Sequence, residues 1–369
     1  MKPRSVWAFA ALAAVLGTAT AAGNLCAQAR PVVRFGFVID GPFHRNNEIH
    51  GMFQTEINDL IRDDFDPQFP DDKRIICDWT LESVKTAVDQ LLADNDVDFI
   101  LALGVIATNE IAHRSNLSKP VIAPIVIDAR LQQLPGTDGT SGVKNLNYLS
   151  FPKNIERDMK TFLEIVKFKK VALLMSKPVL EAIPDAPRLF DAILSELGVE
   201  AVTFPVDQSI AAVVNQFPAD VDAVYNAPLI HLPKTEFIAL VDSLKARRLP
   251  SFSMFGRDDV EMGILASMNT NIFPRLSRRV AINIQRILLG ENAGSLPTMF
   301  PSEHRLTINI ETGRAIDVYP SWGILTEAEL LNARKREIGR VVSLDGAATE
   351  AVRVNLTLRA RTRDVEAAA

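Results

Sequence analysis

Residues that can hold a small ligand follow the ends of several strands expected from the sequence. Asp40 and Asp128 each follow an apolar strand and offer a carboxylate that can pair with an amino group. Phe255 offers a ring on which an aromatic group can stack. In parallel α/β sheets, ligands bind outside the carboxyl ends of the strands. This placement selects a set of candidate ligand-binding residues: Asp40, Gly41, Gly104, Val105, Ile106, Asp128, Ser176, Asn226 and Phe255.

The backbone after Gly104 is a second candidate for ligand recognition. Residues 106–114 are expected to form a short helix, which would leave the N–H groups of residues 104–107 exposed at its start. The positive end of a helix dipole and its unpaired N–H groups favour an anion. We therefore expect these N–H groups to hold a ligand carboxylate.

Metal binding and catalysis receive little support from the residue types and their spacing. His44 and His50 flank Glu48 in a segment that is expected to be a polar loop. Imidazole and carboxylate are suitable metal ligands, but the spacing is not helical and a third ligand is not evident, so we favour a solvated loop. The nucleophile elbow and the phosphate-binding Gly-Lys-Ser/Thr loop are absent. We predict no enzyme, metal or cofactor; a triad assembled only by the fold is the remaining alternative.

The N-terminus has the layout of an export signal. Lys2 and Arg4 precede a short apolar run over residues 6–16, and Ala27-Gln28-Ala29 fits a cleavage site. The apolar run is too short for an ordinary membrane-spanning helix, and a retained anchor is the alternative. Residues 1–29 are therefore predicted to be a signal peptide that directs the chain to the periplasm.

Composition restricts the class of protein further. A chain of 369 residues with 47% hydrophobic residues is long enough for two domains with full cores. The net charge of −5 and the lack of a basic block argue against nucleic-acid binding. Once the signal is removed, Cys77 is the remaining cysteine, so an internal disulfide is excluded. Its apolar neighbours predict a buried thiol.

The candidate residues must be positioned by two successive rounds of alternating strands and helices. The strands are nearly continuous apolar runs, as expected when helices cover both faces of a parallel sheet. The first round contains strands at residues 32–39, 74–79, 97–103 and 120–127. The second contains strands at residues 170–175, 201–204, 223–226 and 250–254. We predict two doubly wound α/β lobes with a cleft between them.

Local signals mark helix ends and the passages between lobes. Thr80 can cap one helix, Gly198 suits the end of another, and a long amphipathic helix is expected to begin at Phe273. The Gly- and Thr-rich segment 133–147 is taken as the first passage between lobes, and a late strand at 306–310 suggests further crossings. The first lobe is expected to comprise residues 30–147 and about 270–293. The second is expected to comprise residues 148–269 and about 294–338, followed by a helical tail at 339–369.

Several stretches in this order resemble ABC-transporter substrate-binding proteins of the type I periplasmic fold, in the branch associated with aromatic amino acids. They include Asp98-Phe99-Ile100-Leu101-Ala102-Leu103-Gly104, Lys119-Pro120-Val121-Ile122, Arg248-Leu249-Pro250-Ser251-Phe252, Val260-Glu261-Met262-Gly263, Ile287-Leu288-Leu289-Gly290 and Ile308-Asn309. The similarity spans roughly residues 32–333. It implies capture of a small molecule, such as an amino acid, by hinge closure, with an ABC permease as partner.

The chain departs from this family at the expected cleft. Where the family often has Gly-Thr-Pro, this chain has Gly104-Val105-Ile106, and where an Asp-Pro pair is common it has Asp128-Ala129. The first change removes a hydroxyl that would offer a polar contact to a ligand.

The C-terminal segment is similar to the start of outer-membrane efflux (TolC-like) proteins. The similarity covers Val342-Ser343-Leu344-Asp345-Gly346-Ala347-Ala348, then Glu350-Ala351-Val352 and Asn355-Leu356-Thr357-Leu358-Arg359-Ala360. It implies an alternative role as a non-catalytic sensing or interaction domain of an outer-membrane efflux fusion protein. An ordinary amphipathic C-terminal helix is the other interpretation of this segment.

Overall fold

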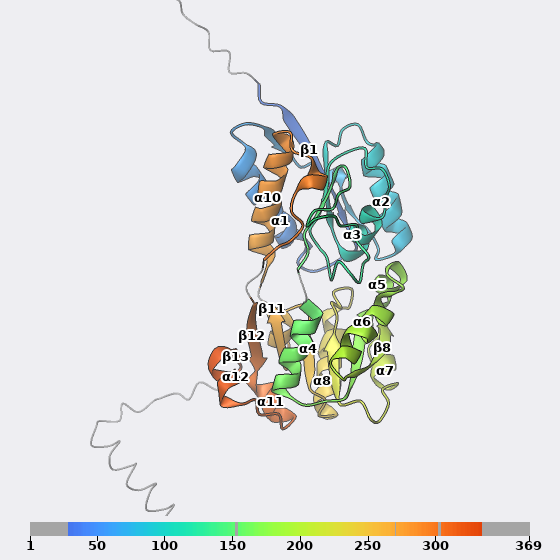
Figure 1. Ribbon diagram of the computed structural model, residues 1–369, viewed down its shortest axis with the longest axis vertical. Coiled ribbons are helices and arrows are strands. Elements are labelled where there is room, and N and C mark those ends of the chain that lie inside the picture. Colours follow the sequence, from blue (N-terminus) through green and yellow to red (C-terminus); the bar gives the residue numbers. More distant parts are fainter. Residues whose placement is uncertain (1–28, 152–153, 270, 302–303, 334–369) are drawn as a thin grey trace, which may run out of the picture.

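The computed structural model describes residues 29–151, 154–269, 271–301 and 304–333. Nearly all of the expected signal peptide, and the whole segment similar to efflux proteins, lie outside these residues. The described chain forms two α/β lobes, each built on its own sheet (Figure 1). Within the described residues, no helix is long and apolar enough to cross a membrane.

The first lobe is built on a parallel sheet with strand order β2-β1-β4-β5-β6. A further strand, β3, also pairs with β1. The strand bounds are β1 (Val32–Ile39), β2 (Asp66–Gln68), β3 (Arg74–Ile76), β4 (Phe99–Leu103), β5 (Val121–Ala123) and β6 (Leu146–Tyr148). The central strands β1, β4 and β5 are largely buried, which explains their continuous apolar sequence.

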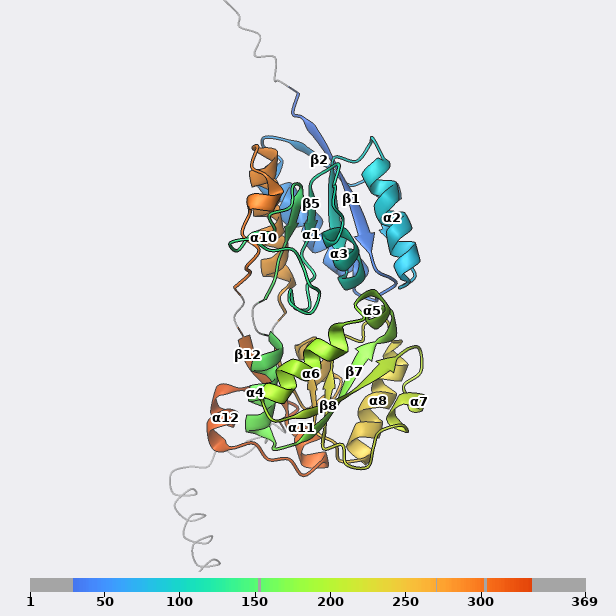
Figure 2. The same cartoon turned by 45° about the vertical axis from the view of Figure 1, so that its right-hand side comes forward.

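Helices cover both faces of this first sheet. On one face, α1 (Asn46–Ile61) and α10 (Phe273–Leu288) lie side by side (Figures 1 and 2). Their buried residues, including Phe53 and Val280, pack against the rings of Phe35 and Phe37. On the other face lie α2 (Leu81–Ala93) and α3 (Val105–Ala112). The Thr80 side chain accepts a hydrogen bond from the N–H of Ser83, which confirms the predicted cap of α2.

The second lobe is built on a sheet with strand order β13-β12-β11-β10-β9-β7-β8, parallel except between β11 and β12. Its strands are β7 (Lys170–Ser176), β8 (Glu200–Val206), β9 (Ala223–Asn226), β10 (Ser251–Ser253), β11 (Ala266–Asn269), β12 (His304–Asn309) and β13 (Glu329–Leu331). Its helices are α4 (Asn154–Ile165), α5 (Lys177–Ala182), α6 (Ala186–Glu196), α7 (Ala211–Val214), α8 (Lys234–Ala246), α9 (Arg257–Glu261), α11 (Ile310–Ala315) and α12 (Trp322–Glu327). α4 and α6 share one buried cluster with the sheet, and α7 and α8 share another.

The predicted lobe boundaries differ from the structure at two places. Residues 133–145 do not lead to the second lobe but return to the first sheet, where β6 pairs in parallel with β5. Residues 294–300, expected in the second lobe, still bond to the first: the N–H of Ser150 donates to Thr298 O, and the N–H of Phe300 donates to Ser150 O. The chain therefore changes lobe between Phe151 and Asn154, between Asn269 and Asn271, and between Pro301 and His304.

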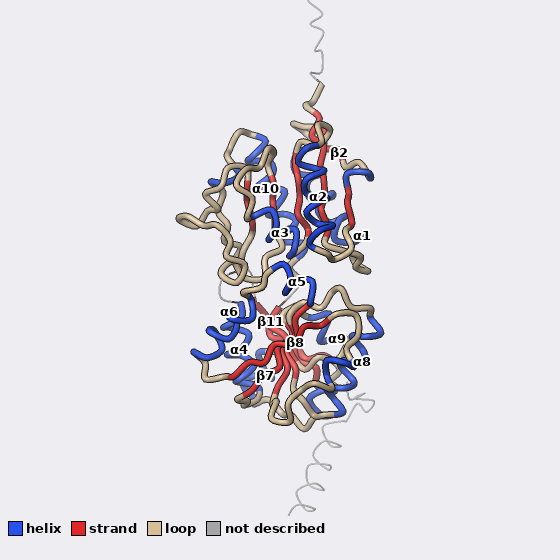
Figure 3. The backbone as a smooth tube through the Cα atoms, turned by 90° about the vertical axis from the view of Figure 1, so that its right-hand side faces the viewer, coloured by secondary structure: helices blue, strands red, loops and turns tan. Residues whose placement is uncertain are grey.

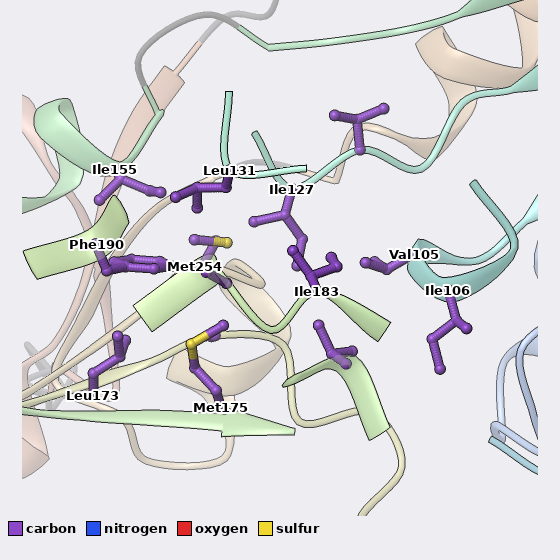
Figure 4. Close-up of a cluster of buried hydrophobic side chains, with 14 of the residues drawn as sticks. Val105, Ile106, Ile127, Leu131, Ile155, Leu173, Met175, Ile183, Phe190 and Met254 are labelled. Atoms are coloured by element: carbon purple, nitrogen blue, oxygen red, sulfur yellow. The ribbon is translucent and has the colours of Figure 1, made fainter. Parts of the chain in front are cut away.

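A single apolar cluster continues from one lobe into the other. Figure 3 shows α5 at the junction between the two groups of strands. Ile183, which follows α5, lies in one buried cluster with Val105 and Ile127 of the first lobe and Met254 of the second (Figure 4). The lobes are thus packed against each other in this structure through an apolar contact.

Cys77 and His50 are both buried, although only Cys77 was expected to be. Cys77 is buried with a free thiol, as predicted. His50 does not lie in a solvated loop: it belongs to α1 and is buried, with its ring centroid 4.4 Å from that of Phe37. The expectation failed for His50 because the helix begins earlier, at Asn46, than the apolar periodicity indicated.

Candidate functional site

A cavity of about 180 Å³ lies between the two lobes. In the first lobe it is lined by residues at the ends of β1 and β4, by residues after β5 and by the start of α10. In the second lobe it is lined by residues that follow β9 and β10 and by α9. The ends of these strands meet at the cavity, as expected for parallel sheets.

Most of the cavity wall is aromatic or aliphatic. The apolar lining residues are Ile39, Phe43, Ile49, Trp79, Leu103, Val105, Pro124, Ile125, Val126, Ile127, Phe151, Pro228, Ile230, Met254, Phe255, Ile272 and Phe273. A wall of this kind favours an apolar ligand, with a few polar groups to fix its orientation.

Asp40 occupies the start of α3. Its two carboxylate oxygens accept hydrogen bonds of 2.8 Å from the N–H groups of Ile106 and Ala107. Burial raises the pKa of Asp40 to about 6, and the hydrogen bonds from the backbone act against that rise. These N–H groups are therefore already paired, contrary to the expectation that they are exposed for a ligand carboxylate.

Close backbone approach explains two glycines at the cavity. A Cβ on Gly104 would lie 2.1 Å from the carboxyl group of Asp40, and a Cβ on Gly41 would lie 2.4 Å from the Trp79 ring. Only a residue without a side chain fits at these two positions. The glycines let the Asp40 carboxylate and the Trp79 ring lie against the backbone at the cavity wall.

The cationic groups of the cavity are paired within the protein. Arg45 forms ion pairs with Glu48 and, across the lobes, with Asp258. Arg257 forms ion pairs with Glu261 and Glu329.

Further contacts cross between the lobes beside the cavity. The rings of Phe43 and Phe255 meet edge to face with centroids 6.2 Å apart. The rings of Trp79 and His231 also lie 6.2 Å apart. On the α3 side, Asn109 Nδ2 donates to the carbonyl oxygen of Ala182 over 3.0 Å. The cavity is therefore bounded by direct contacts between the two lobes.

Five of the predicted site residues line the cavity: Asp40, Gly41, Gly104, Val105 and Phe255. Their contact with a ligand stays a prediction. The rule that ligands bind at the carboxyl ends of strands was sufficient to bring them together.

The other four predicted residues lie outside the cavity lining: Ile106, Asp128, Ser176 and Asn226. Ile106 is fully buried, and Asp128 pairs with Arg130 at 3.2 Å and accepts from its N–H. Ser176 Oγ and both polar side-chain atoms of Asn226 are buried and have no hydrogen-bond partner among the described residues. A position at the end of a strand does not determine whether a side chain faces the cavity or is buried elsewhere in the lobe. The sequence therefore could not separate these four residues from the five that line the cavity.

Sequence reasoning missed much of the aromatic wall. Trp79 was placed inside a strand, whereas β3 ends at Ile76 and leaves Trp79 in the following turn with φ of 72°. Phe273 arrives from the second crossing between lobes, so no local pattern connects it to the cleft. Phe43 follows the β1 end at Asp40-Gly41-Pro42 and could have been found by the same strand-end rule.

Two buried carboxyl groups of the second lobe lie outside the cavity lining. Asp259 accepts a 2.6 Å hydrogen bond from Ser253 Oγ, and burial raises its pKa to about 7. Burial also raises the pKa of Asp158 to about 6; its oxygens accept from Arg157 and from the Tyr225 hydroxyl. Among the described residues, no group of three or more His, Cys, Asp or Glu is placed to hold a metal ion.

No protein-family model and no curated protein matches the sequence. Solved structures do match in fold. An ABC domain from Streptococcus pneumonia in complex with L-Trp is 20% identical, with a TM-score of 0.65 over 80% of this chain and 100% of that one. A conserved domain protein from Vibrio cholerae is 15% identical, with a TM-score of 0.65 over 81% and 99%.

A third structure is a ligand-free, open substrate-binding protein with adhesive properties from Clostridium difficile. It is 13% identical, with a TM-score of 0.54 over 81% of this chain and 99% of that one. At these identities the likeness concerns the fold alone. The chain has the two-lobed α/β fold of type I periplasmic binding proteins, as the sequence predicted.

Proposed function

We propose that this chain is a periplasmic solute-binding protein of an ABC-type uptake system that captures a small molecule between its lobes. The observation that carries the proposal is the cavity itself, which both lobes line and beside which contacts cross between the lobes. The fold supports the same proposal, because three similar structures include two that are described as an ABC domain and a substrate-binding protein.

Residues of both lobes form the cavity wall, so a bound ligand can contact both lobes at once. A ligand that touches both walls binds the closed arrangement more tightly than the open one, and so shifts the population toward closure. A membrane permease would then recognise the closed form. The chain does no chemistry in this role, and the structural neighbours described above are binding proteins or have no enzymatic description.

A thermal-shift screen of the chain that begins at Arg30 tests the proposal. Amino acids, small aromatic solutes and sugars are added one at a time, and a ligand that prefers the native state raises the melting temperature with dose. We expect at least one class to do so. The Phe255→Ala variant should lose most of that shift, because Phe255 lines the cavity.

Tyr319→Ala is the matched control, since Tyr319 is 72% exposed and lies outside the cavity lining. The control should keep the full shift. No shift with any class, or an equal shift in the Phe255→Ala variant, would contradict binding in this cavity.

The alternative role in an outer-membrane efflux fusion rests on residues 342–360, which lie outside the described residues. This role stays a prediction, and the sequence encoded downstream of this chain tests it. Further long helices and strands encoded there would favour the efflux role. A stop codon beside a permease gene would favour uptake.

A further inference from the structure

We propose that the cavity takes a small uncharged aromatic solute with a hydroxyl or ring N–H group, of the phenol or indole class, rather than an amino acid. This inference rests on the proposed function and specifies the ligand of the same site.

The size and the wall of the cavity fit an aromatic ring system. Five aromatic side chains line it: Phe43, Trp79, Phe151, Phe255 and Phe273. An apolar protein cavity of about 150 Å³ is known to bind benzene. The volume of about 180 Å³ leaves room for one ring with a substituent or for two small fused rings.

The cationic groups that the carboxylate of an amino acid would need are already paired within the protein. The Asp40 carboxylate accepts from the N–H groups of Ile106 and Ala107, so part of its capacity to accept from a ligand ammonium is already used. The same bonds occupy the N–H groups that would hold a ligand carboxylate. Arg45 and Arg257 each have two acidic partners within the protein. The carboxylate of an amino acid in this cavity would lose its hydration without meeting an unpaired cationic group among the lining residues, which is costly.

Uncharged polar groups remain to orient the ligand. Asn46 uses its Nδ2 to donate to Gly41 O, and Asn154 uses its Oδ1 to accept from Arg157. Oδ1 of Asn46 and Nδ2 of Asn154 have no hydrogen-bond partner among the described residues, and both residues line the cavity. An amide oxygen suits the O–H or N–H of the ligand, and an amide nitrogen suits its oxygen.

Titration calorimetry with two matched ligand pairs tests this inference on the wild-type chain beginning at Arg30. The pairs are indole with L-tryptophan and p-cresol with L-tyrosine; in each pair the amino acid carries the same ring plus the charged backbone groups. We expect the ring compound to bind at least about ten-fold more tightly than its amino acid, because burying unpaired charges is unfavourable. Phe273→Leu should weaken binding of the ring compounds, and Tyr319→Leu should not.

Different experimental results would contradict the ligand class and the solute-binding role. If the amino acids or a sugar bind more tightly than the ring compounds, the ligand class is wrong and the solute-binding role stands. If no compound of either pair binds and the thermal-shift screen is also negative, both proposals are wrong. Equal loss of ring binding in the Phe273→Leu and Tyr319→Leu variants would also overturn the assignment of this cavity.

Discussion

At the residue scale, Asp40 determines much of the cleft chemistry. Its position after the first strand could be predicted from the sequence. Its role could not, because its hydrogen-bond partners are the N–H groups of Ile106 and Ala107, more than sixty residues away. The apolar residue at Val105 has a similar explanation, because its side chain belongs to an apolar cluster that continues into the second lobe.

Gly104→Ala tests the close approach of the Asp40 carboxylate to the backbone. The new Cβ would lie 2.1 Å from the carboxyl group, so the carboxylate must move and its bonds to α3 must weaken. We expect a loss of about 2 kcal/mol in the free energy of unfolding, measured by denaturant titration. Gly51→Ala is the matched control, because it lies within α1 with no atom within 4 Å of the new Cβ. The control should be neutral or stabilising, and equal losses in both variants would contradict the account.

Asp259 predicts a pH dependence of stability. Its pKa is raised by burial from 3.8 to about 7, so between these values the native state retains a proton that the unfolded chain releases. This contribution to stability is complete below pH 3.8 and is lost as the pH rises through about 7. Asp259→Asn should remove it, by at most about 4 kcal/mol.

The measurement is the unfolding free energy of wild type and Asp259→Asn from about pH 5 to about pH 8. Stability of the wild type should fall relative to the variant as the pH rises. His50 and His304, whose pKa burial lowers to about 4, act in the opposite direction but are present in both proteins. Parallel pH profiles would show that Asp259 does not titrate in this range.

At the element scale, most strands and helices could be predicted because their apolar residues recur with the right period. The buried side chains of α1 recur with helical spacing, whereas the central strands were recognised as continuous apolar runs. The short strand β6 could not, because it has three residues and follows a Gly- and Thr-rich loop that resembles a linker. Its assignment to the sheet depends on pairing with β5, which is a tertiary feature.

The cap of α2 provides a test at this scale. The Thr80 side chain accepts from the N–H of Ser83, one of the N–H groups at the helix start that lack a partner within the helix. Thr80→Ala should lower the unfolding free energy by about 1 kcal/mol, and Thr80→Ser should restore most of it. Equal loss in both variants, measured by thermal unfolding, would assign the effect to the methyl group instead.

At the scale of the whole molecule, the two lobes are held together by residues that are far apart in the sequence. Arg45 pairs with Asp258, and Phe43 meets Phe255. Two lobes could be predicted from two rounds of strands and helices, but these partners could not, because each contact depends on how the two lobes pack against each other. Phe273 of the cavity wall was missed for a related reason, because it reaches the cavity from the second crossing between lobes.

The ion pair between Arg45 and Asp258 predicts that removal of the Asp258 charge makes closure of the two lobes less favourable. Asp258→Asn removes the cross-lobe partner and leaves Arg45 paired with Glu48. Because partly exposed ion pairs contribute at most about 1 kcal/mol, we expect ligand affinity to fall by up to about five-fold and X-ray scattering to report a larger mean size. Asp317→Asn breaks a remote, exposed pair with Arg248 and should change neither. Unchanged affinity and size in the Asp258→Asn variant would show that this pair does not favour closure.

The most direct test of solute capture is the emission of Trp79 during a titration with p-cresol. Removal of residues 1–29 leaves Trp79, which lines the cavity, and the exposed Trp322, which Trp322→Phe removes. With excitation at the red edge of tryptophan absorption, we expect a saturable change in Trp79 emission with p-cresol. An equal concentration of L-tyrosine should produce a much smaller change. Emission that stays constant with p-cresol, with L-tyrosine and with sugars would contradict a solute-binding cavity between the lobes.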